Sequence, residues 1–258
     1  MPSEALQPYI KHYWVLYSPA NLVNEVLFPS GYLELSINIS DKKVKIQIGE
    51  QSENMPVIEV LGHLLKPTRE TVEAGTTILI TRFYPHASSL FLHNSATEFT
   101  NHSTDLGDVL NQNLSGFYNQ LMEQPTIGKK IKVLEAFLLK QLARSQKRLK
   151  AIEQVERVCN YISARQDSFD IKRIAKFAQR SERHLQKLFL DHVGLTPHAL
   201  FAVQRFARSV HLIRTSAASL TDIGYECGYY DQTHFIKQFK SFTGVTPLYV
   251  KKETKKSW

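Results

Sequence analysis

Two short stretches of the sequence place basic and amide side chains at the spacing of one helix face. In "ERHLQKLFLDHV" (182–193), the positions i, i+3, i+4 and i+7 hold Arg183, Gln186, Lys187 and Leu190. In "QTHFIKQFKSF" (232–242), the same positions hold Thr233, Ile236, Lys237 and Lys240. Arginine and lysine donate hydrogen bonds to guanine in the major groove of DNA, and a glutamine amide pairs with adenine. The chemistry predicted for both stretches is therefore the reading of base edges.

The competing interpretation of either stretch is a solvated polar face on a core helix, and one isolated copy would favour it. The charge of the chain favours DNA. Residues 1–150 hold 15 Lys and Arg against 14 Asp and Glu, whereas residues 151–258 hold 17 against 10. The second part thus carries +7 of the net charge of +8. A basic surface of this kind suits a polyanion such as DNA.

A repeated phrase connects the two stretches. "HLQKLFLDHVGLTP" (184–197) and "HFIKQFKSFTGVTP" (234–247) share eight positions at a constant offset of 50 residues. Such a match at fixed spacing indicates a duplicated supersecondary unit. Two basic reading helices, each closed by Gly-x-Thr-Pro, predict a protein that enters the DNA major groove twice.

The elements that position these helices also leave signals in the sequence. From about residue 149 onward the apolar periodicity is helical. Polar side chains suited to capping precede three of the expected helices: Ser181, Ser219 and Asp231. Pro197 opens a long helix, about 197–216, because proline is tolerated in the first helical turn. Each reading helix is therefore expected to follow a shorter helix and a tight turn.

Residues from about 150 to 252 resemble the DNA-binding domain of the AraC/XylS family of bacterial transcription regulators. The resemblance is carried by "IAKFAQRSERHLQKLF", "RFARSVHLI", "IGYECGYYDQTHFIKQFK" and the two Gly-x-Thr-Pro turns. It implies two helix-turn-helix subdomains joined by the long helix. It also implies base contacts from Arg183, Gln186, Lys187, Gln232, Thr233, Ile236 and Lys237. Lys240 joins this candidate DNA-binding site through its spacing.

Three residues near the reading helices carry expectations of their own. His184 and His234 lie beside core-facing residues, so we expect both to be structural. The first turn reads "AQRS" where the family usually has a glycine. Gln179 is therefore expected in a left-handed backbone conformation, at a cost of about 1 kcal/mol.

The first half of the chain has a different pattern. Alternating apolar and polar residues predict strands at 32–40 and 43–50, separated by the polar turn "DKK". A run rich in β-forming residues, introduced by Gly75, predicts a third strand at 76–84. Helical periodicity predicts helices at 105–122 and 127–143. The apolar stripe of the second helix would either pack internally or form a dimer seam.

We therefore expect a multidomain chain: a β-rich domain with trailing helices (1–143), a basic linker (144–150) and an all-α DNA-binding domain (151–258). "YIKHYWVLY", "FPSGYLELSINI" and "EFTNHSTDLGDVL" resemble, in order, a regulatory domain found in front of some AraC-type domains. This resemblance implies a cupin-like sensor or dimerisation domain, and it assigns no ligand-binding residues.

The first half lacks the sequence motifs of enzymes and metal sites. No His-x-His pair occurs among His63, His86, His93 and His102, so we expect no metal site. Cys159 and Cys227 lie in apolar helical runs, which favours buried thiols over a reactive cysteine. We expect no enzyme activity and no cofactor. Seven aromatic residues are candidates either for the core or for a small-molecule pocket: Tyr13, Trp14, Phe28, Tyr32, Phe83, Tyr84 and Phe91.

The function predicted from the sequence is sequence-specific DNA binding by a transcription regulator that acts as an activator. The expected location is the cytoplasm, with no membrane partner, because the chain has neither a membrane-length apolar run nor a secretion signal. RNA polymerase, a small-molecule effector and a second subunit are the other expected partners. The competing hypothesis is an enzyme or metal-binding domain fused to a nonspecific DNA-binding tether.

Overall fold

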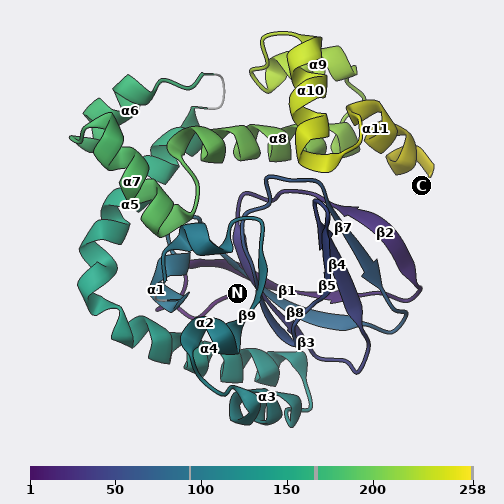
Figure 1. The fold of residues 1–258 in the computed structure, drawn as a ribbon, viewed down its shortest axis with the longest axis vertical. Helices are drawn as coiled ribbons and strands as arrows, with labels where there is room; N and C mark the ends of the chain where they lie inside the picture. The colour runs from purple at the N-terminus through teal and green to yellow at the C-terminus, as the bar shows by residue number, and fades with distance from the viewer. Residues whose placement is uncertain (93, 166–167, 257–258) are drawn as a thin grey trace.

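The computed structural model describes residues 1–92, 94–165 and 168–256. A domain of two antiparallel sheets and several helices is followed by a part that is entirely helical (Figure 1). The predicted fold class, a β-rich domain with trailing helices followed by an all-α domain, is confirmed. Within the described residues, no helix is both long and apolar enough to cross a membrane.

The strands form one sheet with the order β1-β8-β3-β6-β9 and another with the order β2-β7-β4-β5. Their bounds are β1 (Ile10–Tyr17), β2 (Leu22–Leu27), β3 (Leu33–Asn38), β4 (Val44–Ile48), β5 (Gln51–Asn54), β6 (Ile58–Leu61), β7 (Thr68–Val72), β8 (Thr77–Phe83) and β9 (Ser103–Asp105). The three predicted strands correspond to β3, β4 and β8. In β4 the alternation is direct, because Val44, Ile46 and Ile48 are buried between more exposed neighbours.

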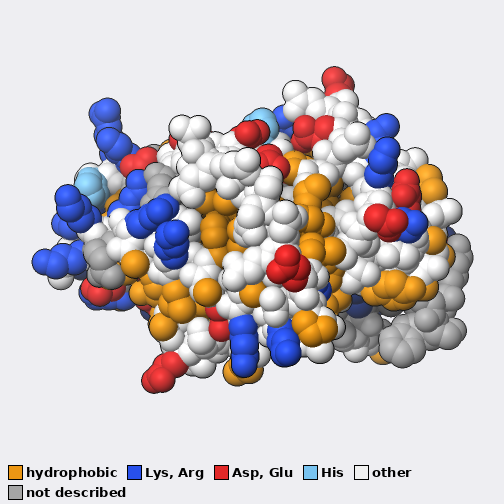
Figure 2. Space-filling view, turned by 90° about the horizontal axis from the view of Figure 1, so that it is seen from below, with side chains coloured by type: hydrophobic (Ala, Val, Ile, Leu, Met, Phe, Trp, Pro, Cys, Tyr) orange, Lys and Arg blue, Asp and Glu red, His pale blue; other side chains and the backbone are white. Residues whose placement is uncertain are grey.

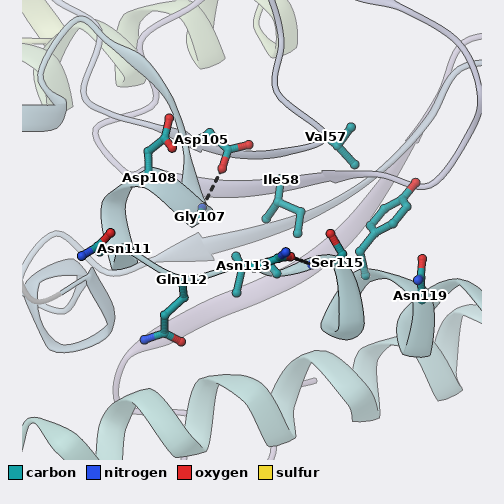
Figure 3. A pocket seen from close by; sticks show the side chains of 12 residues that line it. Val57, Ile58, Asp105, Gly107, Asp108, Asn111, Gln112, Asn113, Ser115 and Asn119 are labelled. Atoms are coloured by element: carbon teal, nitrogen blue, oxygen red, sulfur yellow. Dashed lines mark hydrogen bonds between the residues drawn. The ribbon is translucent and has the colours of Figure 1, made fainter.

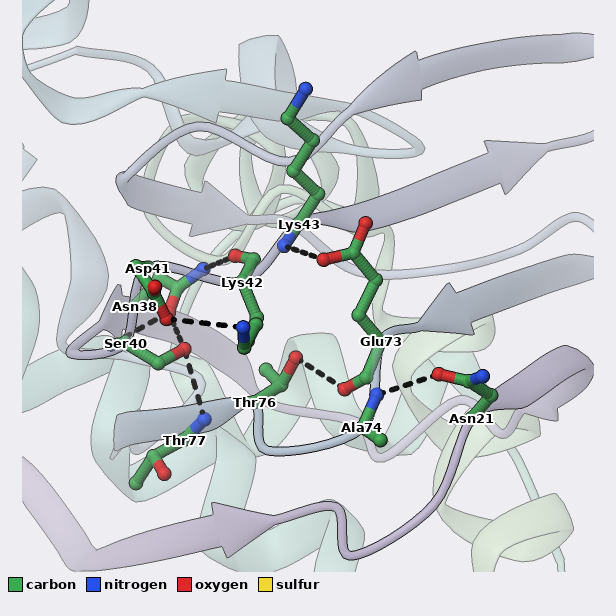
Figure 4. A network of polar contacts seen from close by, with 10 residues as sticks. All are labelled: Asn21, Asn38, Ser40, Asp41, Lys42, Lys43, Glu73, Ala74, Thr76 and Thr77. Atoms are coloured by element: carbon green, nitrogen blue, oxygen red, sulfur yellow. Dashed lines mark hydrogen bonds and ion pairs between the residues drawn. The ribbon is translucent and has the colours of Figure 1, made fainter.

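A polar network joins the β3–β4 turn to the β7–β8 turn (Figure 4). The Asn38 carboxamide oxygen accepts hydrogen bonds from the backbone N–H and the hydroxyl of Ser40. The Ser40 hydroxyl in turn accepts from the Thr77 N–H at 3.1 Å. The Lys43 N–H donates to the Glu73 carboxylate, also at 3.1 Å. The "DKK" turn (41–43) between β3 and β4 is thus held partly by hydrogen bonds from side chains to backbone N–H groups.

The helices that follow the strands are α1 (Ser88–Leu92), the 3-10 helix η1 (Ala96–Phe99), α2 (Leu106–Leu110), α3 (Ser115–Met122) and α4 (Ile127–Arg144). The prediction of one helix over 105–122 is wrong, because the chain turns at Asn111, whose backbone is left-handed (φ 50°, ψ 48°). Asparagine adopts this conformation more readily than most residues. The helix predicted at 127–143 is confirmed as α4. Its Leu134 and Leu138 are buried in the core of the β-rich domain, so its apolar stripe packs internally.

The basic segment 144–150 contains the last residue of α4, the 3-10 helix η2 (Gln146–Arg148) and the start of α5. Ser145 and Arg148 attach it to α1, since they donate hydrogen bonds to the carbonyl oxygens of Leu90 and Ser89 at 2.7 and 2.9 Å. The remaining helices are α5 (Leu149–Ala164), α6 (Ile171–Ala178), α7 (Glu182–Val193), α8 (Pro197–Thr215), α9 (Leu220–Glu226), α10 (Gln232–Thr243) and α11 (Pro247–Lys256). The predicted long helix is confirmed as α8.

The helical part packs closely on the β-rich domain. Helix α8 runs across that domain, with α5–α7 at one end and α9–α11 at the other (Figure 1). The ring of Phe28 stacks on Phe206 of α8, with 6.4 Å between centroids. At the C-terminal end of α7, Gly194 lies so close to η1 that an added Cβ would be 2.5 Å from the Ala96 carbonyl oxygen. The β-rich domain therefore contacts both the helix that joins the two units and the first reading helix.

Candidate nucleic-acid interface

The first reading helix is α7, and the residues before it fix where it begins. The Asp170 side chain caps α6 by accepting from the N–H groups of Lys172 and Arg173. The Ser181 hydroxyl caps α7 by accepting from the His184 N–H. Between the two helices, Gln179 is left-handed (φ 52°, ψ 44°), as predicted. This turn directs α7 away from α6 while one of the orphan N–H groups at its start, that of His184, stays hydrogen-bonded.

The two faces of α7 are sharply different. Leu185, Phe189 and Val193 are fully buried in the helical core. The candidate residues Arg183, Gln186 and Lys187 are all exposed. Leu190, which continues this face at i+7, is half-buried, and its carbonyl oxygen accepts a 2.6 Å hydrogen bond from the Thr97 hydroxyl of η1. The face available to a ligand therefore lies in the first two turns of α7.

The second reading helix is α10, and it repeats this design. A capping box of Ser219 and Asp222 begins α9, and the Asp231 side chain caps α10 by accepting from the His234 N–H. Phe235 and Phe239 are fully buried. The candidate residues on the opposite side are all exposed: Gln232, Thr233, Ile236, Lys237 and Lys240. Ile236 is a large apolar side chain left 37% exposed among polar ones, which suits contact with a thymine methyl group.

Arg205 of α8 is a positioning residue that the sequence reasoning missed. Its guanidinium lies 4.1 Å from the centre of the Tyr229 ring. It donates hydrogen bonds to the Gly228 carbonyl oxygen at 3.2 Å and to the Gln238 side-chain oxygen at 2.7 Å. The turn before α10 and α10 itself are thus both attached to α8. The only sequence signal was a basic residue within "RFARSVHLI". Helical periodicity does not show whether such an arginine faces solvent or contacts another helix.

His184 and His234, which we expected to be structural, both have exposed side chains. Each follows the N-cap by three residues, and it is the backbone N–H, not the ring, that serves the cap. The His234 ring does pack edge-on against Tyr229, at 5.5 Å between centroids. Position beside a core residue is a poor guide here, since adjacent helix positions point about 100° apart.

Among the residues that the structure describes, no group of three His, Cys, Asp or Glu side chains is placed to hold a metal ion. His93 lies outside the described residues. Burial lowers the pKa of His63 to about 4 and also lowers that of His86. Both thiols are buried, and burial raises the pKa of Cys227 to about 11 and that of Cys159 further. Neither cysteine is suited to act as a thiolate nucleophile.

A groove lined largely by polar residues lies on the β-rich domain (Figure 3). It has a volume of about 680 Å³ and lies between the end of β9 and the α2–α3 connection. Its polar groups largely serve the fold: Asp105 accepts from the Gly107 N–H, Asn113 from the Ser115 N–H, and the Tyr118 hydroxyl donates to the Asn38 carbonyl oxygen. The groove is remote in sequence and in contacts from both reading helices.

Exposed basic side chains are numerous on the helices beside α7. On the face shown in Figure 2, Lys and Arg side chains gather mainly at the end of the molecule that carries α5–α7 in Figure 1. Exposed basic residues of α5 and α6 include Lys150, Arg157, Lys172, Arg173 and Lys176. Such a surface beside a reading helix can bind backbone phosphates, whose neutralisation releases counterions.

Two family models match the chain. Residues 174–253 match a model described as a helix-turn-helix domain. Residues 1–105 match a domain of unknown function (DUF6597). The first match covers the units that contain α7 and α10, and the second covers the strands.

Curated relatives are transcription regulators. The arabinose operon regulatory protein of Escherichia coli (strain K12) is 28% identical over 152 residues, which are 57% of this chain and 50% of the relative. The HTH-type transcriptional activator RhaS of Escherichia coli (strain SE11) is 37% identical over 67 residues, 26% of this chain and 24% of the relative. The chain thus matches half or less of the length of these relatives.

Similar solved structures include ToxT from Vibrio cholerae, at 14% identity and a TM-score of 0.47, covering 94% of this chain and 98% of that one. The C-terminal domain of AraT, a response regulator from Geobacillus stearothermophilus, is 22% identical with a TM-score of 0.37, covering 39% of this chain and 84% of its own. With two capped reading helices joined by α8, a helix-turn-helix family match and these curated relatives, residues 174–253 form a helix-turn-helix domain of the AraC type.

Proposed function

We propose that the chain recognises one specific DNA sequence by inserting α7 and α10 into successive segments of the major groove. One observation carries the proposal: in both helices the apolar face is buried, while every candidate reading residue is exposed. Duplication of this arrangement argues against a solvated polar face on two unrelated core helices. Caps on both helices fix where each reading face begins.

The candidate residues divide by chemistry. Arg183, Lys187 and Lys237 are proposed donors to guanine, and Gln186 and Gln232 are proposed partners of adenine. Ile236 would pack on a thymine methyl group, and Thr233 would accept or donate a hydrogen bond. Lys240, two turns into α10, is placed to reach either a base or a phosphate.

The regulatory part of the proposal concerns the β-rich domain. We propose that it is not an enzyme but a sensor or subunit-pairing domain, and that the protein activates transcription through contact with RNA polymerase. Relatives such as RhaS carry the description of transcriptional activators, which supports the sign of regulation. A protein that reads bacterial DNA would work in the cytoplasm. Pairing of two subunits would use a surface other than the buried stripe of α4.

Selection of bound sequences from a random DNA pool by the full chain tests the proposal. The selected duplex is then compared with a scrambled duplex across a salt series. Binding to both should weaken with salt, with a log–log slope of about −0.9 per phosphate contacted. The selected sequence should bind roughly a thousandfold or more tightly than the scrambled one. Equal affinity for the two duplexes would favour the alternative of a nonspecific DNA-binding tether.

A further inference from the structure

A cleft of about 560 Å³ lies between the β-rich domain and α8. One wall is formed by Lys11, Arg82 and the segment Phe28–Tyr32 of the β-rich domain. The other wall comes mainly from α8, with Gln204, Ala207, Val210, His211 and Arg214. The cleft therefore belongs to neither domain alone, and a molecule bound in it would touch both.

The charge of this cleft is strongly one-sided. Lys11, Arg82 and Arg214 all line it, and no Asp or Glu occurs among the described residues of its lining. Arg82 is paired with Glu34, which lines the smaller cavity beside this cleft. Lys11 lies over the Tyr32 ring, 4.2 Å from its centre, and Arg214 lies over Phe28 at 4.8 Å. Rings hold these two cations in place without neutralising them, so an anion would be attracted to the space between them.

The neighbouring His12 reports the same positive environment. Its pKa is lowered, first by burial and then by the positive charges of Arg82 and Lys11. A positive charge is therefore disfavoured at this end of β1, mainly by burial and secondarily by the two nearby cations.

A smaller cavity continues from the cleft into the β-rich domain. The two share Phe28, Ser30, Tyr32 and Arg82. The inner cavity is lined largely by apolar and aromatic side chains: Trp14, Leu27, Phe28, Leu61 and Leu64. The pair of cavities thus offers a cationic mouth and an apolar interior, which is the pattern of a site for an amphiphilic small molecule.

We propose that this cleft binds a small organic anion, with its carboxylate or phosphate between Lys11 and Arg214 and its apolar body directed toward Trp14 and Phe28. The bound anion bridges the β-rich domain and α8. Because α8 carries both helix-turn-helix units, an anion that prefers one arrangement of these walls changes the affinity for DNA. This consequence rests on the proposed function, whereas the binding itself does not.

The binding test uses matched acids and neutral analogues on the full chain: benzoate against benzamide, and phenyl phosphate against benzyl alcohol. Only Trp14 and Trp258 are present in the sequence, so a Trp258→Phe chain reports Trp14 fluorescence alone. At least one acid should bind tenfold or more tightly than its neutral partner, and which acid does so distinguishes carboxylate from phosphate. Equal binding of each acid and its partner, or no binding by any of them, overturns the proposal.

Variants locate the anion. Arg214→Gln and Lys11→Gln should each weaken binding of the preferred acid about tenfold. Arg214→Lys should restore most of the loss, and Lys140→Gln, on the exposed side of α4, should leave binding unchanged. Thermal unfolding checks that each variant is folded. If Arg214→Gln and Lys140→Gln bind the acid equally well, the anion does not lie in this cleft. Affinity of Arg214→Gln for the selected DNA, measured without any acid, shows separately whether the proposed DNA reading holds.

Discussion

The reading residues were predicted from sequence because their signal is local. Helical spacing places Arg183, Gln186 and Lys187 on one face, and the structure leaves all three exposed. What each residue contacts stays a prediction. Gln186→Ala and Lys237→Ala should each weaken the selected site by about 1–3 kcal/mol and relax the preference at one base position.

The control for these variants is Lys172→Ala, an exposed cation on α6 outside the reading faces. Its loss should weaken binding to the selected and the scrambled DNA by the same small amount, since a phosphate contact carries no sequence information. Competition binding with single-base variants of the site measures both effects. If Gln186→Ala weakens binding to the selected and the scrambled DNA equally, Gln186 does not read a base.

The buried carboxyl group of Glu59 leads to a prediction about the pH dependence of stability. It is 2% exposed, and burial raises its pKa to about 7, with Glu34 and Glu70 adding to the shift. Because the pKa in the folded state is raised, protonated Glu59 contributes to the free energy of unfolding. This contribution is fully present below the ordinary pKa of 4.5 and is lost as the pH rises through 7. The loss by pH 8 should be about 3 kcal/mol.

Glu59→Gln removes the ionisation but keeps an oxygen that can accept from the Ser103 hydroxyl. The stability of this variant relative to the unchanged chain should therefore rise steadily between pH 4.5 and pH 8, as measured by urea unfolding. Glu53→Gln, at an exposed position of β5, is the matched control and should show no such trend. Parallel pH profiles for Glu59→Gln and the unchanged chain would show that Glu59 does not titrate in this range.

At the scale of elements, the turn between α6 and α7 makes a prediction of stability. Gln179 is left-handed at a helix end, a conformation that costs most residues about 1 kcal/mol or more. Gln179→Gly should raise the free energy of unfolding by about 0.5–1 kcal/mol, less than the full strain because glycine is more flexible when unfolded. Asn111→Gly, at a similar φ of 50°, should gain less, since asparagine tolerates the conformation. Denaturant unfolding that ranks the two variants the other way would contradict this explanation.

The contact between η1 and α7 is an element-scale feature that no local pattern predicts. The Thr97 and Thr100 hydroxyls donate to the carbonyl oxygens of Leu190 and Gly194, at 2.6 and 2.7 Å. The residues involved are separated by more than 90 positions in the chain. Neither the spacing of the two threonines nor the sequence around them predicts that they donate hydrogen bonds to the other domain.

Two glycines allow the cost of backbone strain to be distinguished from the cost of the close contact between η1 and α7. Gly194 and Gly244 both end a reading helix with positive φ, at +83° and +73°. An added Cβ would lie 2.5 Å from the Ala96 carbonyl oxygen at Gly194, but no closer than 3.4 Å to any atom at Gly244. Both alanine variants should lose about 1–2 kcal/mol to backbone strain, and Gly194→Ala should lose about 1–3 kcal/mol more to the clash. Equal losses in urea unfolding would mean that η1 moves away from α7 at little cost.

At the scale of the molecule, the predictions from the sequence agree with the structure for features set by neighbouring residues. They miss features that depend on contacts between distant segments. Caps and apolar periodicity predicted the helices of the second half. Alternation predicted β3 and β4, and a run of β-forming residues predicted β8. β5 reads "QSEN" and is exposed throughout, so no alternation could reveal it. β6 is buried throughout, so its pattern is equally uninformative. The candidate reading residues were found because they share one helix face, whereas Arg205 and the anion cleft depend on contacts between distant segments.

The arrangement of the whole molecule predicts the shape of its footprint on DNA. Phe206, Val210 and Ile213 of α8 are buried in the core of the helical part and should keep the reading helices at a fixed separation. Two helices on one monomer that enter successive major-groove segments must lie about one helical turn, roughly 34 Å, apart. If the separation differs, the DNA must bend, at a cost of about 1–6 kcal/mol.

Hydroxyl-radical footprinting of the full chain on its selected site tests this arrangement with two alanine variants. One replaces the exposed residues of α7, Arg183, Gln186 and Lys187, and the other replaces Gln232, Thr233 and Lys237 of α10. Each variant should lose protection at one end of the footprint and keep it at the other, because each unit holds its own groove segment. Lys140→Ala on α4 should leave both ends protected. A footprint of only half a helical turn, or loss of the same end in both variants, would mean that a single unit reads the DNA while the other supports the fold.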